Sequence, residues 1–110
     1  MLLPNGNRAI VDIAKLRDYC LCPTHPVGKH KSRVFWEALA LQQSDAAFLR
    51  TALERAASEM EAELGEKDEF GQRYVIEFKL MRGVRSATVL SAWIVRTGEL
   101  QPRLTTCFVR

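Results

Sequence analysis

The stretch RYVIEFKL at residues 73–80 decides the fold, because its bulky apolar side chains recur at every second position. Tyr74, Ile76, Phe78 and Leu80 fall on one side of an extended chain, and mostly charged side chains fall on the other. A strand that buries one face and wets the other shows this period of two. The pattern predicts a half-buried β-strand whose apolar face meets a core.

Further strands are expected on both sides of this stretch. Residues 86–96 are apolar on both faces, which is typical of a strand at the centre of a sheet. Gly98 and Pro102 mark the next turn, and residues 103–109 have the composition of a last strand. Residues 61–67 could form a partner strand ahead of the first stretch. The sequence therefore predicts three or four antiparallel strands.

The N-terminal half shows the longer period of a helix. Residues 44–60 repeat apolar side chains at spacings of three and four, and the face expected to be buried includes Phe48 and Met60. A second helix is expected over residues 29–41. A first helix is expected over residues 13–21.

The boundaries of the first two helices follow from capping and breaking residues. Asp12 is a plausible N-cap for the first helix. The proline- and glycine-containing residues 22–28 end it and form a loop. The sequence thus predicts an α+β fold in which two or three N-terminal helices pack on an antiparallel sheet of three or four strands. We expect one domain over residues 1–110.

Composition places the chain among ordinary globular proteins. Of its 110 residues 47% are apolar and 26% are charged, so disorder is not expected. The net charge of +3 permits an anionic partner without demanding one. Three cysteines, an odd number, and the lack of a leader favour reduced thiols and a cytoplasmic location. No apolar run is long enough for a membrane span.

The first candidate site is the segment HPVGKHKSR at residues 25–33. It gathers His25, His30, Lys31 and Arg33 around the start of the second helix. Free backbone N–H groups at a helix start bind anions, imidazoles exchange protons near neutral pH, and cations stabilise charge on a phosphate. Cations oppose the helix dipole at this end, which points to an anion there. The alternative is a helix start whose cations are simply solvated.

The second candidate site lies on the predicted sheet. Arg103 and Thr105 on the last strand neighbour Ser91 and Trp93 on the central strand. Hydroxyl groups and an arginine on one sheet face can hold a phosphate, and a tryptophan can stack on a base. The alternative is that the threonines are ordinary strand residues and that the tryptophan belongs to the core.

Two weaker patterns complete the candidates. Arg73 and Tyr74 follow a glycine-containing turn and could point into a cleft, although a plain hairpin explains them as well. Cys20, Cys22 and His25 lie close together, but their spacing does not match a zinc site. We therefore expect no metal and no cofactor.

Several well-known catalytic patterns do not occur. There is no Walker loop, dinucleotide fingerprint, nucleophile elbow or His-Glu-x-x-His helix. There is also no carboxylate cluster of the kind that a magnesium-dependent nuclease needs. A nuclease built on this chain would be metal-independent.

Five segments spread over nearly the whole chain carry a resemblance: LPN at residues 3–5, HPxGxHKxRVF at residues 25–35, FGQRY at residues 70–74, SAWI at residues 91–94 and PRLTT at residues 102–106. In order and spacing they resemble a small bacterial family catalogued as a domain of unknown function. The family is similar to C-terminal tips of polymorphic toxins, and its element order is similar to the barnase, EndoU and RelE-like ribonucleases. Those tips often end in Tyr-Pro, which this chain lacks.

The resemblance implies a toxin-like ribonuclease with catalytic groups on a helix and on the opposite sheet face. On the helix side it implies His25, His30 and Lys31. On the sheet side the candidates are Arg73, Trp93, Arg103 and Thr105.

Three hypotheses follow for function. In the first, the chain is a metal-independent RNA endonuclease that uses His25 and His30 as acid and base, with Lys31 or Arg103 stabilising the phosphorane. Trp93 or Tyr74 would stack a base, and an acidic antitoxin or immunity protein would neutralise the activity. In the second, the basic helix start docks an acidic protein or a nucleic acid without chemistry. In the third, a sheet edge pairs two copies into a homodimer.

Overall fold

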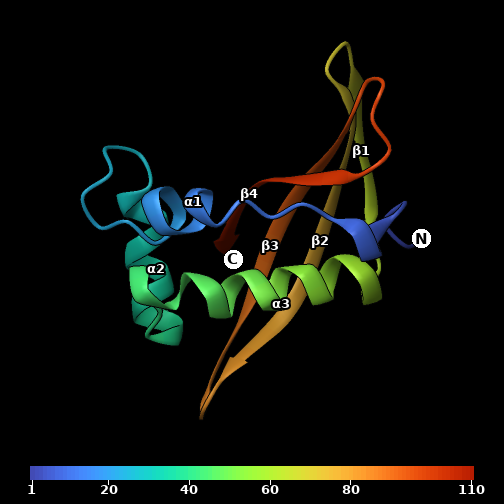
Figure 1. Cartoon of the computed structure of the whole chain (residues 1–110). Helices are drawn as coiled ribbons and strands as arrows, with labels where there is room; N and C mark the ends of the chain where they lie inside the picture. The colour runs from blue at the N-terminus through green and yellow to red at the C-terminus, as the bar shows by residue number, and fades with distance from the viewer.

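Four antiparallel strands form one sheet in chain order, as the computed structural model of residues 1–110 shows (Figure 1). Strand β3 is central, with β2 on one side and β4 on the other. The predicted strands agree with the observed ones to within two residues at each end. Their bounds are Glu63–Asp68 (β1), Gly71–Arg82 (β2), Arg85–Arg96 (β3) and Pro102–Val109 (β4).

The helices precede the sheet in the chain and cover one of its faces. α3 packs against β2, and α2 packs against β3 and β4 (Figure 1). The predicted α+β architecture of N-terminal helices on an antiparallel sheet is therefore confirmed. The helical bounds are Gly6–Arg8 (η1), Ile13–Lys15 (α1), Leu16–Cys20 (η2), Lys29–Leu39 (α2), Gln43–Asp45 (η3) and Ala46–Glu59 (α3).

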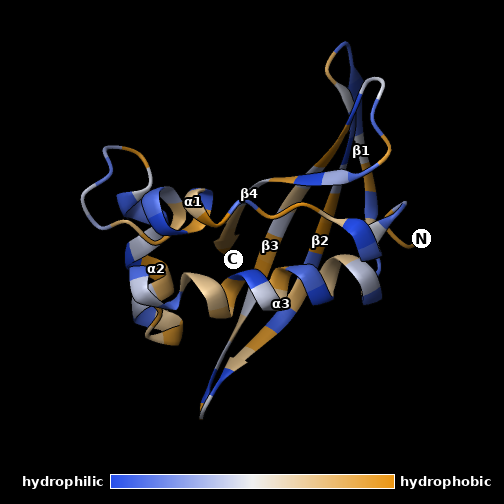
Figure 2. Cartoon of the chain, viewed as in Figure 1, coloured by the Kyte–Doolittle hydropathy of each residue, from blue (hydrophilic) through white to orange (hydrophobic).

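The side chains that set the strand prediction form the core. All four side chains are buried: Tyr74, Ile76, Phe78 and Leu80. Tyr74 lies opposite the fully buried Trp93 of the neighbouring strand β3. Apolar segments run along the middle of β2 and β3, whereas the hairpin ends are hydrophilic (Figure 2). Burial of this apolar surface is the main term that holds helices and sheet together.

The first helix differs from a regular α-helix. Asp12 caps it as expected, because its carboxylate accepts a hydrogen bond from the Ala14 N–H at 3.0 Å. After one α-turn the chain widens into the π-helical η2, which ends at Cys20. The wider turn places both Leu16 and Cys20 in the core, fully buried.

The second helix ends two residues earlier than expected. Ala40 adopts a left-handed backbone conformation with φ of 54°, and its N–H closes the last turn on the carbonyl of Trp36. A residue in this conformation stops helix propagation. No helix of the chain is both long and apolar enough to cross a membrane.

One part of the expected helical face is wrong. Leu49, Leu53 and Ala56 of α3 are buried, but Phe48 is 38% and Met60 is 40% exposed. These two side chains lie beside the second half of β2, after Val75. β1 no longer pairs with β2 there, so no further strand covers them.

Candidate anion-binding surface

The loop that leads into α2 is closed by an imidazole. His25 Nδ1 accepts hydrogen bonds from the backbone N–H groups of Val27, at 3.0 Å, and Gly28, at 2.9 Å. In the neutral ring the proton is then on Nε2. His25 thus fixes the loop conformation through one nitrogen, and its Nε2 has no hydrogen-bond partner within the chain.

Tyr19 connects this imidazole with a lysine of α2. The His25 ring meets the Tyr19 ring edge-on, with centroids 4.8 Å apart. Lys31 Nζ donates to the Tyr19 hydroxyl at 2.7 Å and lies 4.7 Å from the centre of the same ring. The structure therefore brings together His25 and Lys31, two of the predicted site residues, through a tyrosine that was not predicted.

Gly28 allows the close approach on which this arrangement depends. A Cβ atom at this position would lie only 2.1 Å from the carbonyl oxygen of Tyr19. Only a residue without a side chain lets the start of α2 pack directly on the backbone of η2.

His30 lies between two surface hollows. The first, which we call the Trp36 hollow, has a volume of about 540 Å³ and is lined by Trp36, a residue that is 55% exposed. Cationic side chains line the same hollow. The residues that line the hollow are Pro23, Lys29, His30, Ser32, Arg33 and Trp36.

The second hollow, the Phe108 hollow, joins α2 to the end of β4. Its volume is about 360 Å³. It is lined by His30, Lys31 and Val34 from α2 and by Phe108 and Val109 from β4. His30 and Lys31 therefore do reach the sheet, but they meet it at apolar side chains.

The electrostatics of the α2 start favour an anion. No side chain caps the helix at Gly28, and no protein group accepts from the backbone N–H groups of His30 and Lys31. These two donors add to the positive end of the helix dipole and to the nearby cations. Among those cations only Arg33 has a carboxylate nearby, with Glu37 at 3.9 Å.

The predicted sheet residues Arg103 and Thr105 lie farther along β4. Arg103 forms an ion pair with Glu99 at 3.1 Å, which lowers the pKa of that carboxyl, and Thr105 Oγ1 donates to the carbonyl of Ala92 at 3.1 Å. Arg103 is five residues from Phe108, or roughly 16 Å along a strand. The structure thus does not bring Arg103 together with His30 at one phosphate group.

Three other predicted residues belong to the core. Trp93 and Ser91 are completely buried, and Tyr74 is 7% exposed. The Trp93 indole N–H donates to Ser91 Oγ at 2.9 Å, and that hydroxyl donates to the carbonyl of Ile76 at 2.9 Å. These side chains satisfy one another inside the protein and present no ring to solvent.

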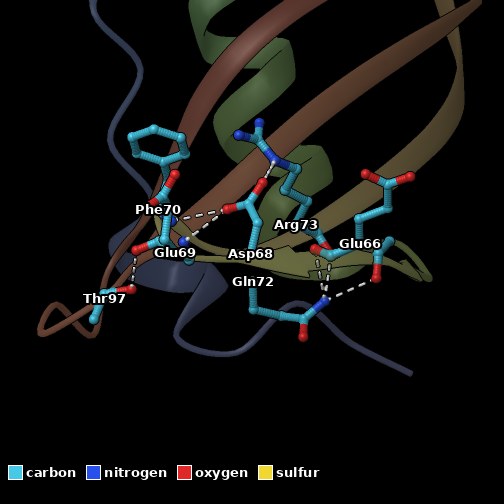
Figure 3. A network of polar contacts seen from close by, with 9 residues as sticks. Glu66, Asp68, Glu69, Phe70, Gln72, Arg73 and Thr97 are labelled. Carbon is cyan, nitrogen blue, oxygen red and sulfur yellow. Dashed lines mark hydrogen bonds and ion pairs between the residues drawn. The ribbon is translucent and has the colours of Figure 1, made fainter.

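Arg73 lies at the β1–β2 hairpin, where it supports the turn (Figure 3). Its Nε donates to Asp68 at 3.3 Å, and the same carboxylate accepts from the N–H groups of Phe70 and Gly71. These bonds, led by the one from Phe70, lower the pKa of Asp68. Gln72 ties the hairpin further by donating to the carbonyl of Gly65 at 2.9 Å.

Two aromatic residues of the surface were not predicted from the sequence. Trp36 is placed one position past Phe35 of the buried helical stripe, so its exposure could have been derived from the period of α2. Phe108 follows the buried Cys107 on β4, and strand alternation places it on the other face. No group of three or more histidine, cysteine or acidic side chains gathers in a way that could hold a metal ion.

Comparison with known proteins gives a family and no assigned activity. A family model described as a domain of unknown function, DUF6883, matches residues 2–110. No curated protein and no solved structure matches the chain.

Proposed function

Since the chain belongs to the DUF6883 family of domains of unknown function, its function has to be inferred from its residues, and we propose that it binds single-stranded RNA through the start of α2. The observation that carries this proposal is the Trp36 hollow. There the exposed Trp36 lines the same hollow as Lys29, His30 and Arg33. Proteins bind single-stranded nucleic acids by combining cations for the phosphates with aromatic rings for the bases.

The second hollow extends the same surface. Lys31 lines this second hollow on the other side of His30. A base stacked on Trp36 would place the adjoining backbone along His30. The free N–H groups of His30 and Lys31 would then face a phosphate.

Metal-independent cleavage of the bound RNA is a second candidate function. It is favoured by the position of His30, an exposed imidazole shared by both hollows. In this proposal His30 removes the proton of a ribose 2′-hydroxyl, and the 2′-oxygen attacks the adjacent phosphorus. Lys31 stabilises the phosphorane, and a water molecule protonates the leaving 5′-oxygen, because the His25 ring is neutral while its Nδ1 accepts two backbone N–H bonds. The products are a 2′,3′-cyclic phosphate and a free 5′-hydroxyl.

Toxin-like behaviour belongs to this second candidate. Unchecked RNA cleavage would arrest a host cell, so the chain would need an acidic antitoxin or immunity protein covering the same cations. The alternative that the α2 start docks an acidic protein without chemistry uses the same side chains. Arrest of growth on expression, relieved in His30→Ala, supports the ribonuclease and opposes mere docking.

Binding is tested by fluorescence anisotropy with a labelled oligouridylate. We expect Lys29→Ala and Arg33→Ala to weaken binding and to lower the salt dependence by about one counterion each. Arg55→Ala is the matched control, because Arg55 is an exposed helical arginine on α3. No binding at low salt, or an equal loss in the control, would refute the proposal.

Cleavage is tested by incubating RNA with the protein in the presence of EDTA. We expect fragments that end in a cyclic phosphate, and a loss of about 10²-fold or more in rate for His30→Ala. Binding by that variant should persist, because the remaining cations are intact. Tight binding without any cleavage would leave the RNA-binding function standing and reject the enzymatic one.

A further inference from the structure

The β2 strand is paired on one side only over its second half. Strand β1 covers Gly71 to Val75 and then departs, whereas β2 continues to Arg82. The side of residues 76–82 that faces away from β3 has no strand partner. This free edge is roughly 20 Å long at the usual rise of a strand.

The alternation of an antiparallel ladder shows which backbone groups this edge presents. Arg82 and Arg85 face each other across the two-residue turn Gly83–Val84, so every second residue from Arg82 bonds to β3. Consistent with this, the Ile76 carbonyl points toward β3, where it accepts a hydrogen bond from the Ser91 hydroxyl. Glu77, Lys79 and Met81 therefore direct their N–H and C=O groups outward.

These outward groups have no partner within the chain. None of the backbone hydrogen bonds outside the helices and strands involves Glu77, Lys79 or Met81. An unpaired row of this kind on an exposed edge is a template for another strand.

An apolar groove adjoins the free edge on the helix side. It has a volume of about 530 Å³ and lies between α3 and β2. Phe48 and Met60, two large apolar side chains that the fold leaves exposed, line it together with Phe78 and Leu80. Its volume falls in the usual range of binding sites.

We propose that this edge and groove accept an extended peptide segment of a partner protein, which adds to the sheet as a strand beside β2. Outward main-chain groups are satisfied by another main chain at strand spacing, which selects an extended segment over a helix. This docking surface is separate from the α2 start and does not depend on RNA binding.

The side chains of the edge define the sequence of that segment. Residues opposite Phe78 and Leu80 project toward the helices and enter the groove, so they are apolar. The residue opposite Lys79 projects to the other sheet face, where Lys79 has no ion-pair partner, whereas Glu77 already pairs with Arg110. The partner segment therefore alternates apolar and polar residues and carries an acidic one opposite Lys79.

A random linear peptide library displayed on phage and panned against the full chain tests this proposal. Enriched peptides are synthesised, and their affinities are measured by fluorescence anisotropy. We expect alternating apolar residues with an intervening Asp or Glu. We expect a loss of at least tenfold in Met81→Pro, which removes an outward N–H without removing a bond to β3, and none comparable in Met81→Ala.

A groove variant gives a second, independent readout. Thr51→Trp on α3 fills the groove and should weaken binding at least tenfold, whereas Thr51→Ala should not, and this pair decides the matter where Met81→Pro fails to fold. Enriched peptides that are insensitive to both variants would overturn the proposal, as would failure to enrich any peptide. A concentration-dependent dimer of the chain that is abolished by Met81→Pro would also overturn it, because a second copy would then be the occupant.

Discussion

The sulfur atoms of Cys20 and Cys107 lie 3.9 Å apart in the core, although 86 residues separate them in the chain. The Cys107 thiol donates to the Cys20 sulfur, and this hydrogen bond lowers the pKa of Cys20 to about 7, with a smaller contribution from the charge of Lys31. The same contact, together with burial, raises the pKa of Cys107 well above its usual value. The contact joins η2 to β4 beside the proposed RNA-binding surface.

Removal of the Cys107 thiol should raise the lowered pKa of Cys20 again. In a Cys22→Ser background, which removes the more exposed thiol, we expect Cys107→Ala to raise the pKa of Cys20, because the largest of the hydrogen bonds that offset burial is then lost. Ultraviolet absorbance of the thiolate as a function of pH measures this. The Cys22→Ser protein alone is the reference, with a transition near 7, and identical titrations of the two proteins would contradict the assignment.

The two tryptophans should separate stability from binding. Trp93→Ala removes a fully buried indole and should cost about 3–5 kcal/mol of unfolding free energy. Trp36→Ala changes an exposed position and should stay within about 0.5 kcal/mol of the original protein, yet it should weaken oligouridylate binding by about 1–3 kcal/mol through lost stacking. Urea unfolding and fluorescence anisotropy test both. An unchanged unfolding free energy in Trp93→Ala would contradict the stability prediction. Unimpaired oligouridylate binding by Trp36→Ala would contradict the binding prediction.

Gly28→Ala should disturb the α2 start through a single methyl group. Because the new Cβ would collide with the Tyr19 carbonyl oxygen, at 2.1 Å, we expect a loss of about 1–3 kcal/mol in unfolding free energy. RNA binding should fall as well, since Lys31 is positioned on Tyr19. Gly83→Ala is the comparison. A Cβ atom at Gly83 would meet no other atom within 4 Å, so this substitution strains only the backbone of the turn, through its positive φ of 59°. Equal affinities for Gly28→Ala and the original protein would oppose this role of the close approach.

Asp68 should stabilise the β1–β2 hairpin in a pH-dependent way. Its pKa is lowered in the folded state, first by the hydrogen bond from the Phe70 N–H, so the folded protein binds the proton less tightly than the unfolded chain. The stabilisation is therefore complete above the unfolded-state pKa of about 4 and is lost as pH falls through the lower folded-state value. We expect Asp68→Asn to lower Tm near neutral pH, with a difference that shrinks toward about pH 3. A constant difference in Tm at every pH would contradict the prediction.

Much of the secondary structure could be predicted because it depends on neighbours in the chain. The period of two at residues 73–80 placed β2, and Asp12 capped the first helix as its residue type suggests. The π-helical turn of η2 and the exposure of Phe48 could not be predicted in this way. Both depend on which distant segment packs against the helix, and a helical period does not contain that information.

Of the candidate site residues, only those on the helix side lie close together at the surface of the structure. His25, His30 and Lys31 do gather near one surface, because they lie within one turn and loop of the same segment. The proposed base-stacking residue is a different matter, since Trp93 is in the core and Trp36 is exposed. The period of α2 could have indicated that Trp36 is exposed, whereas only the packing of the helices on the sheet decides that Trp93 is covered.

By itself, the sequence determined the helices, the strands and their order, together with a cluster of cations at the start of α2, because periodicity and capping act over a few residues. Only the tertiary structure decided that Cys20 meets Cys107, that α2 meets β4 and that half of the β2 edge has no partner. These relationships join segments that are far apart in the chain, and they arise when burial of the common core fixes the register of the sheet against the helices.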